Sequence, residues 1–460
     1  MSVLDVEDIT IGFGGRTILE DASFRLLKGE HVGLIGANGE GKSTFLNIIT
    51  GKLSPDAGKV SWCKHITTGY LDQFSTLTKG KTIRDVLREA FQHLYDLEKE
   101  MLASYDKMSD CSDEEIELLL QDAGEIQEIL DYSGFYNLDS KIEEFANGLG
   151  LGEIGLDREV EELSGGQRAK VLLTKLLLQN PMILILDEPT NFLDIVSIRW
   201  LEKFLRSWKS ELIVISHDRD LVDSVTTHIV GIHRGVVRKI KGSTGKYYAQ
   251  LHADEELHEK RRVLDEKKRK EMTEYINTFR SQASRAKGVQ SCIKKLEKME
   301  KLDKLEEIRT LSFSFNYEPL RASQIMDVND LTFSYSGGEP YLISDLNFVV
   351  NSHDKICIVG KNGKGKTTLL KLLSGRLKPV SGSVKAHPAI VPVYYEQANT
   401  ADLHDDLTVE EEISLGRAFI DKSRVRGICG AMMFSGDDAE KKVKVLSGGE
   451  RSRVLLGKLL

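Results

Sequence analysis

The sequence predicts an α/β fold made of two related domains that are joined by a charged helical segment, with the second domain incomplete. Two observations lead to this prediction. An apolar stretch, a glycine-rich turn and a helical pattern occur in this order at residues 31–49 and again at 355–373. Between the repeats, residues 253–311 are rich in charge and contain no proline, which is typical of exposed helices. Because internal duplication is the simplest origin of such a repeat, we expect three parts. They are a first domain over residues 1–250, a linker over 251–320 and a second domain over 321–460.

The glycine-rich turns have the spacing of a phosphate-binding loop. Glycines let backbone N–H groups converge on phosphate oxygens, and the following helix adds the partial positive charge of its N-terminus. Lys42 and Lys366 can reach the β- and γ-phosphates, and the hydroxyls of Ser43 and Thr367 can hold Mg²⁺. The sequence therefore predicts two nucleotide sites, because a chance origin is not expected twice. The predicted loop residues are Gly36, Asn38, Gly39, Gly41, Lys42, Ser43 and Thr44, and then Gly360, Asn362, Gly363, Gly365, Lys366, Thr367 and Thr368.

Aromatic and glutamine side chains recur at fixed places around these loops. Phe13 precedes the first loop and Tyr335 precedes the second. A single aromatic here would more often belong to the core, but its repetition favours stacking on a nucleobase. Each loop is also followed by a glutamine at a predicted strand end, Gln73 and Gln397. At such a place a glutamine can ligate Mg²⁺ or orient a water molecule.

A second anion-binding turn occurs in both repeats. Ser164-Gly165-Gly166 and Ser447-Gly448-Gly449 each follow a leucine and open a predicted helix. The serine suits the N-cap position, and the free N–H groups of the first helical turn can bind an anion.

Two acids follow a buried strand that we predict at residues 182–186. Asp187 can position Mg²⁺ beside the phosphate loop, and Glu188 can polarise a water molecule. The strand predicted at 212–215 leads to His217, which can contact a γ-phosphate here, although a lone histidine is more often structural. The predicted catalytic residues are Glu188, His217 and Gln73. The predicted metal ligands are Ser43, Gln73, Asp187, Thr367 and Gln397.

The second repeat lacks the matching acids and histidine. Asp187 comes 23 residues after Ser164, whereas only 13 residues follow Ser447. A doubly wound parallel sheet is buried on both faces. We therefore expect the second domain to lack interior strands and to expose an apolar edge.

An acidic helical insertion is predicted at about residues 90–140. Lys42 and Ser164 are 122 positions apart, whereas Lys366 and Ser447 are 81 apart, so the first repeat carries 41 more residues. The insertion is either a solvated acidic face or a docking surface for a basic protein, since nucleic acid would be repelled.

The middle of the linker, residues 276–296, holds basic side chains and no acidic one. Gly288 suits a turn between two helices. This part is either a passive coiled spacer or a surface for the phosphate backbone of RNA. The candidate RNA-binding residues are Arg280, Arg285, Lys287, Lys294 and Lys295.

The bulk composition limits the possible classes of protein. A net charge of −8 does not indicate that the whole molecule binds polyanions. The five cysteines are scattered, which fits a reducing cytosol and argues against a disulfide framework or a zinc site. No apolar run reaches the roughly 18 residues that span a bilayer, and the first residues do not open a signal peptide. We expect a cytoplasmic protein without direct membrane contact.

Taken together, the phosphate loop, LSGGQ at residues 163–167, ILILDEPTN at 183–191 and SHD at 216–218 resemble a tandem ATP-binding-cassette (ABC) ATPase. The resemblance covers nearly the whole chain. Two cassettes with a basic helical linker are similar to the ABC-F group of ribosome-associated factors. The acidic insertion and residues 194–202 are similar to the YbiT/YkpA-like bacterial branch. Phe192 departs from the DEPTNxLD pattern, where many relatives have histidine or asparagine, and this loop difference leaves the chemistry intact.

The resemblance implies ATP and Mg²⁺ as cofactors and head-to-tail closure of the two cassettes within one monomeric chain. It implies a first site that combines Phe13, Lys42, Ser43, Gln73, Asp187, Glu188 and His217 with Ser447, Gly448 and Gly449. It implies a second site that combines Tyr335, Lys366, Thr367 and Gln397 with Ser164, Gly165 and Gly166, and the catalytic acid and histidine of that site are missing here.

The family resemblance favours an ATPase that binds the ribosome as a translation factor and places its linker near rRNA and tRNA. A ribosome-protection factor against antibiotics would use the same machinery. A transporter's ATPase subunit, a third possibility, would need a membrane partner and has no use for a basic hairpin. A non-enzymatic tether is the fourth.

Overall fold

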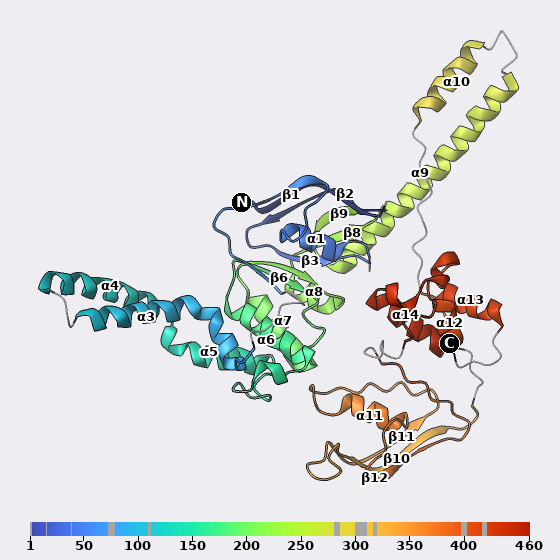
Figure 1. The fold of residues 1–460 in the computed structure, drawn as a ribbon. Coiled ribbons are helices and arrows are strands. Elements are labelled where there is room, and N and C mark those ends of the chain that lie inside the picture. The colour runs from blue at the N-terminus through green and yellow to red at the C-terminus, as the bar shows by residue number, and fades with distance from the viewer. Residues whose placement is uncertain are drawn as a thin grey trace. The chain divides into compact units, whose positions relative to one another are not determined.

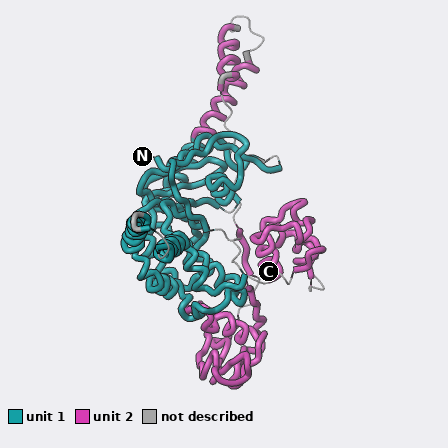
Figure 2. The backbone as a smooth tube through the Cα atoms, turned by 60° about the vertical axis from the view of Figure 1, so that its left-hand side comes forward, with its two compact units in different colours: residues 1–260 teal, residues 261–460 magenta. Residues whose placement is uncertain are grey.

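The computed structural model describes residues 2–14, 16–37, 39–71, 79–108, 112–279, 286–299, 311–315, 320–396, 403–415 and 421–460. The chain divides into two compact units, residues 1–260 and residues 261–460 (Figure 2). Within the described ranges, every helix is too short or too polar to span a bilayer. The predicted α/β class is confirmed.

A six-stranded sheet forms the centre of the first unit. Its strands are β3 (His31–Ile35), β5 (Thr68–Tyr70), β6 (Ile183–Asp187), β7 (Glu211–Ile215), β8 (His228–His233) and β9 (Val236–Lys241). The order is β5-β6-β7-β3-β8-β9, and only the pairing of β8 with β9 is antiparallel. Most residues of β3, β6, β7 and β8 are buried, as expected for parallel strands that are covered on both faces.

A three-stranded antiparallel sheet covers one side of this core. It contains β1 (Ser2–Phe13), β2 (Arg16–Leu27) and β4 (Ala57–Trp62) in the order β2-β1-β4. Helix α1 (Lys42–Ile49) packs Phe45, Leu46 and Ile49 into a hydrophobic cluster that both sheets share. The loop before α1 is therefore held between two sheets.

Helices complete the first unit (Figure 1). They are α2 (Ile83–Arg88), α3 (Gln92–Lys107), α4 (Asp113–Tyr132), α5 (Leu138–Gly148), α6 (Gly165–Leu178), α7 (Ile195–Ser207) and α8 (Arg219–Val225). Short 3₁₀ helices lie at Glu89–Phe91, Phe135–Asn137 and Val160–Glu162. Helices α3 and α4 lie side by side as a hairpin within the acidic insertion.

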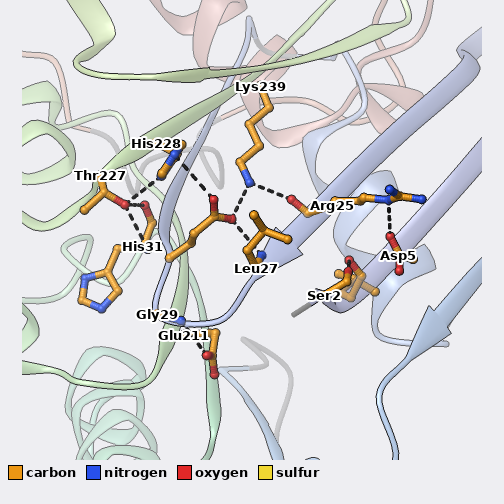
Figure 3. Close-up of polar contacts among 12 residues, drawn as sticks. Ser2, Asp5, Arg25, Leu27, Gly29, His31, Glu211, Thr227, His228 and Lys239 are labelled. Atoms are coloured by element: carbon orange, nitrogen blue, oxygen red, sulfur yellow. Dashed lines mark hydrogen bonds and ion pairs between the residues drawn. The ribbon is translucent and has the colours of Figure 1, made fainter.

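A polar cluster fastens the edge of the six-stranded sheet at which the parallel strands begin (Figure 3). The nearly buried Glu30 carboxylate accepts hydrogen bonds from the Lys239 ammonium and from the Leu27 N–H, and His228 lies 3.5 Å away. Burial opposes ionisation here, but the hydrogen bond from Lys239 holds the pKa of Glu30 below its usual value. On the next strand, Glu211 accepts a hydrogen bond from the Gly29 N–H.

The linker contains α9 (Thr244–Phe279) and α10 (Ala286–Lys298). The predicted turn at Gly288 is wrong, because Gly288 lies within α10. Helix α10 is amphipathic. Val289 is buried and Cys292 and Leu296 are half-buried, while Lys287, Lys294 and Lys295 are exposed. At 100° per residue the lysines lie on the side opposite Val289. The Arg269 guanidinium of α9 donates to the carbonyl of Met299, just beyond α10, so the two helices are fastened together near this end.

The second unit repeats only part of the first. Strands β10 (Gln324–Phe333), β11 (Ile343–Asn351) and β12 (Ser381–Ala386) form an antiparallel sheet in the order β11-β10-β12. Beyond the linker, its described helices are α11 (Lys366–Leu373), α12 (Val409–Ser414), α13 (Lys422–Ala431) and α14 (Gly448–Leu459), with 3₁₀ helices at Gly436–Glu440 and Val443–Val445.

Residues 355–359 of this unit match β3 of the first unit in sequence but are not part of a strand. Ile356 is 55% exposed and Val359 is 70% exposed, whereas β3 is paired on both sides with β7 and β8. Parallel strands need such neighbours for their hydrogen bonds and for the burial of their side chains.

This difference predicts a contrast in hydrogen exchange within one molecule. After correction for intrinsic rates, amides of residues 355–359 should exchange at least about 100-fold faster than those of 31–35, because unpaired backbone exchanges without unfolding. Exchange measured by mass spectrometry compares the two segments directly. Equal protection would show that residues 355–359 are paired in solution.

Candidate functional site

The first phosphate loop connects β3 to α1. Gly41 has φ 95°, a left-handed conformation that favours glycine. A β-carbon there would also lie 2.5 Å from a methyl group of Ile18. The Lys42 ammonium donates to the carbonyls of Gly36 (2.8 Å) and Ala37 (3.0 Å). The lysine therefore lies folded back along its own loop, with its positive charge inside the curve of the backbone.

Two acids and a histidine lie beside this loop at the ends of β6 and β7. Asp187 is the last residue of β6 and pairs with Ile215, the last residue of β7. Glu188 has φ 49°, an uncommon conformation for a non-glycine residue. Its N–H donates to the Ile215 carbonyl at 2.9 Å, and this bond holds the turn. The strand pairing thus brings both acids close to His217, two residues beyond β7.

Glu188 has one oxygen that is bound and one that is not. Oε2 accepts a hydrogen bond from the His217 N–H at 3.3 Å. Oε1 is buried, has no hydrogen bond among the described atoms, and lies 3.4 Å from His217 Nε2. Buried acceptors are nearly always hydrogen-bonded, so Oε1 is available to accept a hydrogen bond from a water molecule or a ligand.

Burial sets the electrostatics of the site. It raises the pKa of Asp187 and of Glu188, although Lys42 and His217 favour their ionised forms. Burial also lowers the pKa of Lys42, against the attraction of Glu188, Glu40 and Asp187. Opposite charges in a partly desolvated place interact more strongly than in water. The site therefore suits an anionic ligand that binds together with a cation.

A cavity of about 280 Å³ brings these groups together. Phe13 lines it and is 52% exposed, so its ring is accessible for stacking, as the sequence predicts. The cavity is lined by Phe13, Ile18, Gly39, Gly41, Lys42, Ser43, Thr44, Asp187, Glu188, Ile215 and His217. Of these, Ile18 and Ile215 were not predicted from the sequence. Ile215 could have been predicted, because it is the last apolar residue of the strand before Ser216-His217. Ile18 could not, because its sequence context shows only the alternation of a strand.

The residues present fit Mg²⁺. The Ser43 hydroxyl and the Asp187 carboxylate line the same cavity. Magnesium usually takes one or two protein oxygens, phosphate oxygens of the substrate and several waters. The predicted ligands Gln73 and Gln397 lie outside the described residues, as do Asn38, Arg280 and Arg285.

The two serine turns cap helices as predicted. Ser164 accepts from the Gln167 N–H at the start of α6, and Gln167 in return accepts from the Ser164 N–H. Ser447 and Glu450 form the same capping box at the start of α14. A β-carbon on Gly166 would lie 3.4 Å from the Phe192 ring. The residue that departs from the family pattern therefore lies beside the first serine turn.

The second phosphate loop has the local geometry of the first. The Lys366 ammonium donates to the carbonyls of Gly360 and Lys361, both at 2.7 Å. The Tyr335 hydroxyl lies 3.0 Å from the Thr368 hydroxyl, which places the phenol ring beside α11. Thr367 follows Lys366 in the first turn of α11. The pairing of each loop with the serine turn of the other cassette stays a prediction.

A phosphate loop, a strand-end Asp-Glu pair and a histidine around one cavity define a nucleotide-hydrolysing P-loop domain. The ABC transporter family profile matches residues 19–191 and 343–460, and a second ABC transporter profile matches residues 230–315.

Relatives extend this finding. The chain is 41% identical to the uncharacterized ABC transporter ATP-binding protein YfmM of Bacillus subtilis, over 100% of this chain and 88% of that protein. It is 32% identical to ABC transporter F family member 2 of Arabidopsis thaliana, over 99% of this chain and 68% of that protein. It is also 32% identical to the energy-dependent translational throttle protein EttA of Haemophilus influenzae, over 97% of this chain and 79% of that protein.

The chain therefore belongs to the ABC transporter family, in its ABC-F group, and is an ATPase. The predicted likeness to YbiT is confirmed at 33% identity to the Escherichia coli O157:H7 protein. The prediction of two cassette domains is confirmed as well.

The geometry predicts separate effects for two substitutions. Glu188→Gln should leave ATP affinity within about threefold and slow hydrolysis by a factor of about 100 or more, because water activation is lost while Lys42 is kept. Lys42→Ala should instead weaken nucleotide binding. Single-turnover hydrolysis together with equilibrium binding of ATP separates the two effects. If the Glu188→Gln variant hydrolyses ATP at the same rate as the parent chain, Glu188 is not a catalytic residue.

Proposed function

We propose that the chain binds ATP with Mg²⁺ in the first-cassette cavity, hydrolyses it there, and acts on the ribosome as a translation factor. The observation that carries the enzymatic part is the meeting of Lys42, Asp187, Glu188 and His217 around one cavity. These residues come from three separate parts of the chain, since Asp187 and Glu188 are adjacent. Stability of the fold does not require one cation, two acids and one imidazole to gather beside a glycine-rich loop, so their arrangement indicates a function.

Each side chain has a distinct task in this proposal. The Lys42 ammonium moves from its loop carbonyls to the β- and γ-phosphates, where it neutralises their charge. Ser43 and Asp187 would hold Mg²⁺, which would supply positive charge against the charge that develops on the phosphate groups. The unsatisfied Oε1 of Glu188 accepts a proton from the attacking water. The side chain of His217 lines the cavity, is 65% exposed and contacts the γ-phosphate.

The ribosomal part of the proposal depends on the linker. Three lysines form one exposed side of α10, opposite the side that carries Val289. Glu297 is the only acidic residue of this helix, so the exposed side has a net positive charge. A surface of this kind suits the phosphate backbone of RNA. The relationship to EttA, a protein named for a role in translation, supports a ribosomal target.

A role in protecting the ribosome from antibiotics would use the same parts. Drug susceptibility of cells that express the chain separates it from a general translation role. Fractionation tests the transporter alternative, since a transporter subunit would sediment with membranes.

The linker surface gives a prediction about salt. Changing Lys287, Lys294 and Lys295 to glutamate should weaken ribosome binding, because three phosphate contacts are lost and repulsion is added. The slope of log K against log salt should flatten by about 2 to 3, at about 0.7 to 0.9 per contact. Co-sedimentation with ribosomes in a Glu188→Gln background with ATP, at several salt concentrations, gives both values.

The matched control changes three exposed lysines of the first unit, Lys64, Lys203 and Lys209, to glutamate. It alters net charge equally and should keep the parent's slope. If the linker variant sediments with ribosomes as well as the parent does, and with the same salt slope, the linker is a passive spacer.

A further inference from the structure

The phosphate loop of the first unit is connected to linker helix α9 by three side chains. Glu40 belongs to the loop itself, His233 is the last residue of β8, and Glu255 lies on α9. His233 Nδ1 lies 3.4 Å from Glu40 Oε1, and His233 Nε2 lies 3.0 Å from Glu255 Oε1. One imidazole thus bridges two carboxylates that are far apart in the sequence.

Glu40 is an unexpected residue for a phosphate-binding loop. A carboxylate there repels phosphate, and the second loop has Lys364 at the same place. The side chain is fixed by two contacts. Oε2 accepts from the Ala37 N–H of the same loop at 3.0 Å, while Oε1 faces His233. The negative charge is therefore part of the loop's structure, and the imidazole fixes its direction.

The α9 side of the bridge is also charged and partly buried. The side chains of Glu40, His233 and Glu255 are 19%, 14% and 29% exposed, so water screens them less than it screens an ordinary surface pair. Arg234 adds a positive charge, since its Nε lies 3.2 Å from His233 Nε2 and its Nη2 lies 3.7 Å from Glu255 Oε1.

The phosphate loop, β8 and α9 are also closely packed against one another. A β-carbon on Gly36 would lie 2.7 Å from the Ile232 carbonyl, and one on Gly231 would lie 2.0 Å from the Tyr247 ring. The loop therefore touches β8, and β8 touches α9, with no space for larger residues. Burial, with the charge of Glu40 as a further cause, raises the pKa of Tyr247 to about 12.

We propose that Glu40, His233 and Glu255 are positioning residues for ATP binding, and that they couple the phosphate loop to the packing of the first part of α9, residues 244–260, which belongs to the first unit. The proposal rests on the proposed function of the loop. Coupling is reciprocal: ATP at the loop stabilises the packing of residues 244–260 of α9 on the first unit, and displacement of these residues lowers the affinity of the loop for ATP.

A double-mutant cycle on the whole chain tests the coupling, with a fluorescent ATP analogue as the probe. Glu255→Gln removes one charge on α9 and should raise the Kd about threefold or more, as is typical of directly coupled residues. In a Glu40→Gln background the same change should have no further effect, whatever Glu40→Gln does alone. Glu256→Gln is the matched control, because Glu256 is exposed and its carboxylate lies 3.5 Å from Lys260 of the same helix. An equal effect of Glu255→Gln in both backgrounds, or none in either, overturns the proposal.

Hydrogen exchange supplies a readout that a merely structural role would not change. In the parent chain, ATP should slow exchange both in the loop, residues 36–44, and in α9 near residues 250–258. In Glu40→Gln, the loop should still respond and α9 should not. An α9 response that persists in Glu40→Gln overturns the coupling. If ATP fails to protect the loop of the parent, the proposed function itself is wrong.

Discussion

The parallel register of β3, β7 and β6 is the constraint on which the rest of the site depends. Gly33 of β3 pairs with Val214 of β7, and Asp187 of β6 pairs with Ile215 of β7. All three strands therefore end at one edge of the sheet, where α/β proteins bind ligands. The phosphate loop, the acids and the histidine each follow one of these strands. Their meeting results from backbone pairing and needs no contact between the side chains themselves.

The site combines charges that folding alone would not favour. Burial raises the pKa of two carboxyls and lowers that of the neighbouring lysine, and Glu188 adopts an uncommon backbone conformation. Such features persist when the surrounding structure determines them, and they occur most often at functional sites. Here the Glu188–Ile215 hydrogen bond and the buried strands β6 and β7 provide that support.

Most of the first-cassette site could be predicted from the sequence, because strand, turn and helix signals surround each motif. Lys42, Ser43, Asp187, Glu188 and His217 all line the cavity. Tertiary packing could not be predicted in the same way. Ile18 packs against Gly41 through the shared core of two sheets, and no local pattern indicates this. The bridge joins Glu40 of the phosphate loop to His233 and Glu255, which lie more than 190 positions later in the sequence. Neither His233 nor Glu255 belongs to a motif that the sequence analysis recognised.

The second repeat shows the limit of reasoning from local patterns. Residues 356–359 (Ile-Cys-Ile-Val) have the composition of a buried strand, yet they lie outside any strand. A parallel strand is defined by its neighbours, and local propensity does not supply them. The expectation that strand neighbours are missing there came from comparing the two repeats, whereas the hydrophobicity of residues 355–359 alone would have predicted a buried strand.

The central claim is that hydrolysis takes place at the first cassette. Orthovanadate with MgATP tests it most directly, because a trapped vanadate occupies the place of the γ-phosphate and cleaves the nearby backbone under ultraviolet light. Mapping of the fragments by mass spectrometry should show cleavage within residues 36–44. Cleavage confined to residues 360–368 would contradict the account.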